Sequence, residues 1–328
     1  MAETFGDALI RLRKAARLSQ TALAQRVHVS QSSLSRYESG LQEIDEQTVA
    51  RLDEVLDAGG ELLELWSPLD TGPLNSDQRD AIAYSVKHPE RIDAEAVRAL
   101  ADSLAAQRRL DDVIGPEPMI PATLAQADMV TGLLRATGGP IRRELAAVAS
   151  EHVQFAGWLR AEARQDSEAV RLLTEAEDLA DEADDGTLAA QAANFKGYLA
   201  RQQGRPRAMV RWFLAAYGTP GAHPSQRIGD AIQAAQGYAR LGERDTALRL
   251  LDDADDMVDA AGDPPETAYW LTPTFHRLNS GLAHLALGDY AVAVDHLETG
   301  LGNLPDDQQG AEWTNEYRAG LEQAKAAR

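Results

Sequence analysis

The sequence predicts an all-α fold, in which a small bundle of five helices precedes a longer array of paired helices. Two observations predict it. Apolar residues recur three or four positions apart through most of the 328 residues, which is the spacing of a one-sided helix rather than of a strand. From about residue 150 onward, one pattern of small and large residues also returns several times, which is typical of a helical repeat array.

The composition narrows the class of protein. There is no cysteine, which excludes disulfides, thiolate metal sites and a cysteine nucleophile. No run of about 18 apolar residues and no secretion signal occurs, so we expect a cytoplasmic protein with no membrane partner. The net charge is −20, yet residues 5–40 carry six basic and two acidic residues, a local charge of +4. A basic segment on an acidic body is compatible with nucleic-acid binding through that segment.

Residues 18–40 predict a helix, a tight turn and a second helix. The apolar side chains of residues 20–27 have the spacing of one helix face, and the two residues that follow suffice only for a turn. Ser30 is a strong N-cap residue and Gly40 a usual helix stop, so the second helix is expected over residues 31–39.

The outer face of this second helix is polar. Leu34 and Tyr37 lie three residues apart and are expected to face inward. Amide, hydroxyl and guanidinium groups remain on the other side, with no carboxylate in the first two turns. Such groups bond base edges and phosphates in a DNA major groove.

Flanking segments complete a small bundle. Residues 5–16 have one apolar face, Asp45 can cap a helix over residues 46–57, and a short helix is expected over residues 61–66. Together these segments make a five-helix, all-α domain of about 66 residues.

The residues of the bundle that carry a family resemblance occur in one order without a gap: Leu12-Arg13, Leu18-Ser19-Gln20, Leu23-Ala24, Val29-Ser30, Leu34-Ser35, Tyr37-Glu38 and Ser39-Gly40. This order resembles the helix-turn-helix domain of the Xre, Cro and phage-repressor family over residues 5–57. The resemblance implies a lambda-repressor-like domain that binds double-stranded DNA through its third helix.

The resemblance also implies roles for single residues. Arg13 and Glu38 match a structural ion pair of the family, and Gln20 matches a phosphate contact. The remaining expected DNA-binding positions are the base readers Gln31, Ser32 and Ser33, a further DNA-facing Arg36, and Ser30 and Ser35 beside them. After Gly40 the family usually has a basic residue and then a proline, whereas this chain has Leu-Gln-Glu-Ile-Asp, so a phosphate contact from that loop is not expected.

The domain boundaries follow from changes in composition. We expect a DNA-binding domain over residues 1–66, and a linker over residues 67–77, which are rich in Pro, Gly, Ser and Asp. A helical connecting or dimerisation region follows over residues 78–149, with one helix ended by Gly115-Pro116-Glu117-Pro118 and the next beginning near residue 124. Repeats with a C-terminal capping helix are expected over residues 150–328.

Four positions mark the internal repeat: Arg164, Gly204, Gly242 and Gly288, spaced 40, 38 and 46 residues apart. A small residue stands seven positions before each marker and a large one nine positions after it. The small residues are Gly157, Gly197, Ala235 and Gly281, and the large ones Leu173, Phe213, Leu251 and Leu297. Such small residues allow paired helices to cross closely, and the large ones fill the space between pairs.

This pattern resembles the tetratricopeptide repeat, and the resemblance implies an α-solenoid whose first helices line a concave groove. Polar and aromatic side chains there can bond an extended peptide backbone, and arginines can meet a carboxylate. Counting from the markers, the expected groove residues are Glu151, Gln154, Trp158, Gln191, Asn194, Tyr198, Arg201, Gln236, Arg240 and Asn279.

The leading hypothesis is a homodimeric, sequence-specific transcriptional regulator on an inverted-repeat operator, whose repeats sense a peptide, a small molecule or a protein partner. The combination resembles regulators of Gram-positive bacteria, and the composition is typical of an actinobacterial source. The alternative is a scaffold whose repeats bind a partner protein and whose DNA-binding domain only localises it. No catalytic motif occurs, so we expect no enzyme, no cofactor and no metal; His284 and His296 are expected to be packed or solvated.

Overall fold

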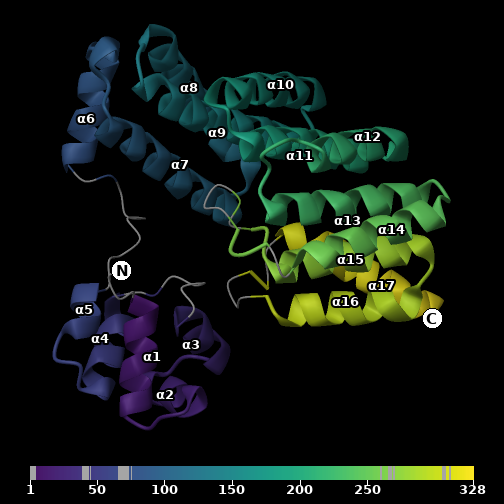
Figure 1. Cartoon of the computed structure of the whole chain (residues 1–328), viewed down its shortest axis with the longest axis horizontal. Coiled ribbons are helices and arrows are strands. Elements are labelled where there is room, and N and C mark those ends of the chain that lie inside the picture. Colours follow the sequence, from purple (N-terminus) through teal and green to yellow (C-terminus); the bar gives the residue numbers. More distant parts are fainter. Residues whose placement is uncertain are drawn as a thin grey trace. The chain divides into compact units, whose positions relative to one another are not determined.

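The structure is a computed structural model that describes residues 5–38, 44, 46–65, 74, 76–258, 261–264, 268, 270–304, 308–309 and 312–328. The structure is 82% helix, and no strand occurs among the described residues. The predicted all-α class is therefore confirmed. The chain divides into two compact units, residues 1–73 and 74–328, each of which folds around its own core (Figure 1).

The first unit is a bundle of short helices around one apolar core. The leucines at positions 9, 23, 34, 52 and 62, each from a different helix, are completely buried in it. The bundle therefore has the five-helix arrangement that the sequence predicts. Its helices are α1 (Phe5–Ala15), α2 (Gln20–Val27), α3 (Gln31–Glu38), α4 (Glu46–Leu56) and α5 (Glu61–Leu65).

A close crossing holds α1 against α3. A Cβ atom added at Gly6 would collide with the backbone carbonyl oxygen of Glu38, so only glycine permits this approach. The crossing fixes the end of α3, the helix expected to enter DNA, on the first helix of the bundle.

The second unit is a helical solenoid in which consecutive helices pack as neighbouring pairs (Figure 1). None of the described helices is both long and apolar enough to cross a bilayer. The helices are α6 (Ser76–Lys87), η1 (Pro89–Arg91), α7 (Ala94–Ile114), α8 (Pro116–Ala136), α9 (Ile141–Glu162), α10 (Asp166–Ala183), α11 (Gly186–Gln202), α12 (Pro206–Tyr217), α13 (Pro224–Arg240), α14 (Arg244–Met257), α15 (Pro273–Leu287), α16 (Tyr290–Gly302), η4 (Glu312–Thr314) and α17 (Asn315–Ala327).

One helix begins earlier than expected. The Gly-Pro-Glu-Pro sequence ends α7 as predicted, but α8 starts directly at Pro116 rather than near residue 124. Gly115 makes the break with a φ of 75°, and prolines are tolerated in the first turn, where their missing N–H groups have no helical acceptor. Of the expected linker, most residues lie outside those described, and α6 begins at Ser76.

The repeat markers share one backbone conformation. Arg164, Gly204, Gly242 and Gly288 all have a positive φ, between 58° and 79°, and each stands in the turn between two paired helices. This left-handed conformation favours glycine, which explains why glycine recurs at the marker.

The predicted contacts between small and large residues are present. A Cβ added at Gly157 would lie 2.9 Å from Leu173, one at Gly197 would lie 2.9 Å from Phe213, and one at Gly281 would lie 2.6 Å from Leu297. The small residue of each pair therefore gives the large residue of the next helix its space. At the end of the solenoid, Tyr317 and Leu321 of α17 are buried against α15 and α16, as expected for a capping helix.

Candidate functional site

Local side-chain caps shape the helix-turn-helix. The Ser19 hydroxyl accepts a hydrogen bond from the Ala22 N–H over 3.1 Å and begins α2. His28 ends that helix with a left-handed φ of 59°. The Ser30 hydroxyl then accepts a bond from the Ser33 N–H over 2.9 Å, which confirms it as the N-cap of α3.

A chain of hydrogen bonds joins three helices behind the outer face of α3. Arg13 of α1 forms an ion pair with Glu38, with an Nη2–Oε2 distance of 2.9 Å, so the expected structural pair is confirmed. The Gln20 amide donates to Glu38 over 2.8 Å, and the Gln31 amide donates to the Gln20 oxygen over 2.7 Å. The Glu38 carboxylate raises the pKa of Arg13, so this guanidinium stays charged.

This network places the expected readers at the start of α3. Gln31 and Ser30 are exposed, and Gln20, Ser33 and Ser35 are half-buried. The side chains of Ser32 and Arg36, and all of residues 39–43 and 45, lie outside the described part of the structure.

Two features of this unit escape the sequence prediction. The bond between Gln20 and Gln31 makes a predicted phosphate contact also the support of a predicted base reader. Asp53, which is buried, accepts bonds from the N–H groups of Gly60 and Leu62 and so fixes the turn into α5. The available signal for this cap was the position of Asp53 on the apolar face of α4, four residues after Val49 and three before Leu56.

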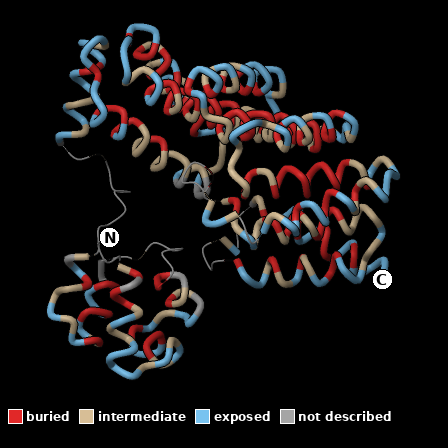
Figure 2. Tube along the Cα trace, viewed as in Figure 1, coloured by how far each residue is buried: buried red, intermediate tan, exposed pale blue. Residues whose placement is uncertain are grey.

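The second unit contains the residues expected to line a groove. They stand on the first helices of the pairs. Five of the ten are buried, four are half-buried and Arg240 is exposed. Figure 2 shows that α13 is buried along most of its length. We call the polar side chains of these helices the inner row: Gln154 of α9, Gln191 and Asn194 of α11, Gln226, Asp230, Gln233 and Gln236 of α13, and Asn279 of α15.

Asp230 is the one carboxylate of the inner row. It is completely buried, and its oxygens accept bonds from the Asn194 amide over 2.5 Å and from the Gln226 amide over 3.0 Å. Burial raises the pKa of Asp230 to about 8, against the effect of both amides. Sequence reasoning missed this residue, although Gln226, Asp230 and Gln233 have the spacing of one helix face among small residues.

Two further amides of the inner row have side-chain atoms without a hydrogen-bond partner among the described residues. Gln154 donates to the Leu188 carbonyl over 3.2 Å, but its oxygen has no partner among the described residues. Gln191 is only 1% exposed, and neither its oxygen nor its nitrogen has one. Buried amides in proteins are mostly hydrogen-bonded to protein groups, water or a ligand, because an unsatisfied one costs about 1–3 kcal/mol.

An aromatic cluster adjoins the row. The ring of Trp158 lies 5.1 Å from that of Phe195 and 5.0 Å from that of Tyr198, and Trp270 stacks on Phe195 at 6.1 Å. The Tyr198 hydroxyl donates to Glu162 over 2.8 Å. Two of the expected groove residues thus share one apolar surface with two residues that the sequence did not single out.

Arg201 links the solenoid to its last helix. This buried guanidinium lies 3.0 Å from the Glu316 carboxylate of α17, and it also donates to Gln233 and Asn279. Arg240 is exposed, and neither hydrogen bond nor ion pair joins it to a described residue. Of the remaining expected groove residues, Glu151 pairs with Arg108 of α7 over 3.0 Å, and Gln236 is buried.

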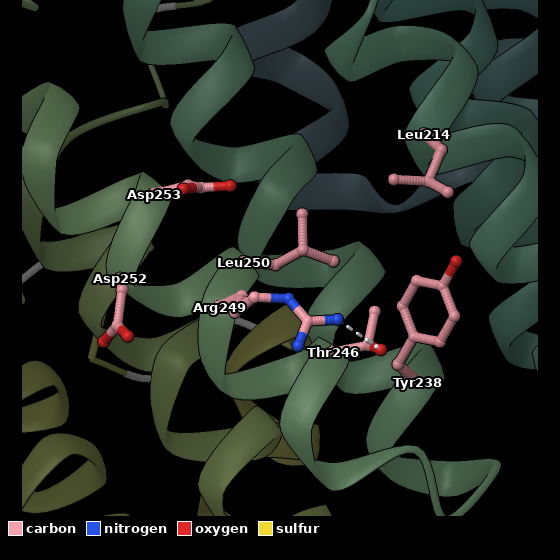
Figure 3. A pocket seen from close by; sticks show the side chains of 7 residues that line it. All are labelled: Leu214, Tyr238, Thr246, Arg249, Leu250, Asp252 and Asp253. Carbon is pink, nitrogen blue, oxygen red and sulfur yellow. Dashed lines mark hydrogen bonds between the residues drawn. The ribbon is translucent and has the colours of Figure 1, made fainter.

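A hollow of about 350 Å³ lies elsewhere, on α12, α13 and α14 (Figure 3). None of the expected groove residues lines it. Arg249 donates to the Thr246 hydroxyl over 3.0 Å, and Asp252 and Asp253 stand on the same helix. The described residues contain no group of three His, Cys, Asp or Glu side chains able to hold a metal ion; His284 and His296 pack ring to ring at 5.4 Å.

Comparisons with known proteins identify the first unit. Residues 4–66 match the family of helix-turn-helix domains. No curated protein matches the chain. A crystal structure of Bacillus thuringiensis PlcR with the peptide PapR7 and DNA is similar at 14% identity and a TM-score of 0.33, covering 79% of this chain and 96% of that one. The apo form of the competence regulator ComR from Streptococcus vestibularis is similar at 12% identity and a TM-score of 0.32, covering 99% and 98%.

Proposed function

We propose that the chain is a sequence-specific transcriptional regulator of the Xre, Cro and phage-repressor type, acting in the cytoplasm. The observation that carries this proposal is the support of Gln31 within the helix-turn-helix domain. An exposed amide at the first turn of α3 is held by Gln20, which is held in turn by Glu38. A glutamine fixed in this way is suited to a two-bond contact with an adenine edge.

The proposed molecule is a homodimer. In this proposal, residues 1–66 form the DNA-binding domain and residues 67–77 the linker that follows it. Residues 78–149 form a connecting or dimerisation region, and residues 150–328 form tetratricopeptide-like repeats that sense a ligand. Two-fold pairing would place the recognition helices on an inverted repeat, about one DNA turn or ~34 Å apart. Light scattering after size exclusion tests the pairing, and a monomer in complex with a single half-site would contradict it.

DNA binding is tested by selecting bound duplexes from a random pool and measuring the selected sequence by gel shift. Gln31→Ala with Ser33→Ala should weaken binding to that sequence by about 1–3 kcal/mol per lost base contact. Gln25→Ala, at an exposed position of α2, serves as the control and should bind normally. An unchanged sequence preference in the double variant would overturn the assignment of the readers.

For the repeats, we propose an extended peptide as the ligand of the inner row. Buried amides that lack partners support this proposal, because a peptide backbone offers donors and acceptors at regular intervals. Gln191→Leu keeps the size of the side chain but removes its amide. This variant should fold at least as stably and bind a random pentapeptide library more weakly; equal binding by both proteins would contradict the proposal.

A further inference from the structure

Three charged residues stand near the ends of α11 and α13 and the start of α17. Arg201 is the penultimate residue of α11, Arg240 is the last of α13, and Glu316 stands in the first turn of α17. We call these three residues the arginine cluster. Its charge is +1, although the chain as a whole carries −20.

Arg201 is fully engaged in this cluster. Its side chain is 6% exposed and lies 3.0 Å from the Glu316 carboxylate. Its other nitrogen donates to Gln233 over 3.2 Å and to Asn279 over 3.4 Å, and its guanidinium lies 5.0 Å above the Tyr198 ring. A buried arginine requires such a partner, because an uncompensated charge in the interior is strongly destabilising.

Arg240 is a second cation within electrostatic range of the same carboxylate. Partial burial and the like charge of Arg201 lower the pKa of Arg240, although the residue as a whole remains exposed, whereas Glu316 raises the pKa. No described residue forms an ion pair or a hydrogen bond with Arg240. A purely structural role explains the ion pair between Arg201 and Glu316. It does not explain why Arg240 lies near the like charge of Arg201 without a partner of its own.

The cluster is open to solvent on one side. The Glu316 side chain is 43% exposed, and Arg240 is exposed, whereas Arg201 is not. A group from solvent therefore reaches Arg240 directly, and it reaches Arg201 where Glu316 now lies. Two guanidiniums with one carboxylate leave donors for a second carboxylate, which arginine binds through two parallel hydrogen bonds.

We propose that Arg201 and Arg240 bind a carboxylate of the ligand, namely the C-terminal carboxylate of a short peptide, and that Glu316 is its competitor within the chain. The aromatic cluster defines the neighbouring part of the ligand. The Tyr198 ring lies 5.0 Å from the Arg201 guanidinium and 5.0 Å from the Trp158 ring, so the residue that carries the carboxylate lies against an aromatic surface. This selects a peptide with an apolar last residue.

The exchange also has a consequence for the fold. When a ligand carboxylate replaces Glu316 on Arg201, α17 loses its ion pair with α11, which lies 115 residues earlier in the chain. The ligand thus changes how the last helix is held, which is the differential contact that a ligand needs in order to shift a conformational equilibrium. This inference rests on the proposed peptide-binding function and adds the ligand's chemical class and its internal competitor.

The test uses the full chain and two random pentapeptide libraries, one with free C-terminal carboxylates and one with amidated C-termini, offered together and distinguished by mass. Bound peptides are counted after size exclusion. We expect the free-carboxylate library to be enriched about tenfold or more, the factor that corresponds to one charge-assisted hydrogen bond. Apolar residues should dominate the last position of the bound peptides.

Variants separate the three members of the cluster. Arg240→Met should abolish the preference for the free carboxylate, while Arg207→Met, at an exposed position of α12, should keep it. Glu316→Gln should raise the retention of free-carboxylate peptides several-fold, because it removes the competitor; Glu322→Gln, exposed on the same helix, should not. Thermal melting checks that each variant folds.

The outcomes distinguish this inference from the function on which it rests. Equal enrichment of both libraries would overturn the carboxylate site and leave peptide binding intact. Retention of neither library would overturn both. An Arg240→Met protein that still prefers free carboxylates, or a Glu316→Gln protein that binds them no better, would overturn the assignment of these residues. If Glu316→Gln destabilises the fold, the result with Arg240→Met alone decides.

Discussion

The Gln31 side chain donates a hydrogen bond to the Gln20 side-chain oxygen over 2.7 Å, across the turn between the two helices of the helix-turn-helix. Gln20 in turn donates to Glu38 over 2.8 Å, so an amide on the outer face of α3 is anchored to the ion pair behind it. The two glutamines therefore act as one unit, although the sequence assigns them different contacts with DNA.

Gln20→Ala should reduce sequence discrimination as well as affinity. A side chain that contacts only phosphate contributes equally on all sequences, whereas loss of the support for Gln31 frees the base reader. We expect about 1–3 kcal/mol less discrimination at the base that Gln31→Ala also affects, measured by competition gel shift against single-base variants of the selected site. A uniform loss across all sequences would show that Gln20 contacts phosphate alone.

Glu38→Gln should destabilise the first unit. Its carboxylate is 4% exposed and pairs with Arg13, which is 12% exposed, so the substitution leaves a nearly buried guanidinium without its counter-charge. We expect a loss of about 3 kcal/mol, at the lower end of the range for a broken buried pair. Hydrogen exchange of the α1 and α3 amides measures this loss of stability within the full chain.

Glu54→Gln provides the matched control for this substitution, because Glu54 is exposed on α4 of the same unit. The free energy of opening that amide exchange gives for this variant should remain within about 0.5 kcal/mol of that of the parent. If both variants exchange alike, the ion pair does not support the bundle.

Gly197→Ala should destabilise the solenoid by about 1–3 kcal/mol, because its new Cβ would lie 2.9 Å from the Phe213 ring in a closely packed crossing. Phe213→Leu in the same chain should recover part of the loss by vacating that space. Urea unfolding of the single and double variants measures the coupling, and strictly additive effects would contradict the contact.

At a second glycine, substitution by alanine should change the stability in the opposite direction. Gly132 lies inside α8, and the nearest atom to its added Cβ is a flexible arginine tip at 4.0 Å. Gly132→Ala should therefore stabilise the protein by about 0.5–1 kcal/mol through helix propensity alone. The contrast tests whether packing, rather than glycine itself, sets the effect at position 197.

The agreement between sequence and structure has a physical limit that these residues illustrate. Periodicity predicts helices, and the spacing of Gly197 from Phe213 predicts their contact, because both follow from the geometry of a single repeat. The start of α8 was misjudged because proline ends a helix and also begins one. Asp230, Glu316 and Trp270 were missed, since their roles depend on partners 36 to 115 residues away that no local pattern brings together.

Asp230 should make the stability of the solenoid depend on pH. Burial raises its pKa from 3.8 to about 8, so the folded protein holds a proton that the unfolded chain releases between about pH 4 and pH 8. The contribution of this group is therefore complete below about pH 4 and is lost as the pH rises through 8. The free energy of unfolding should fall by up to about 1.4 kcal/mol per pH unit within that window.

Asp230→Asn should remove this slope, because the amide is neutral at every pH and fills nearly the same space between Asn194 and Gln226. We expect the variant to match the parent near pH 4, where the Asp230 contribution is complete, and to exceed it at pH 8, as measured by urea unfolding at both values. Asp252→Asn, at an exposed position of α14, should follow the parent at both. Parent and Asp230→Asn curves that fall in parallel would show that burial does not raise the pKa of Asp230 and that its charge is stabilised inside the inner row.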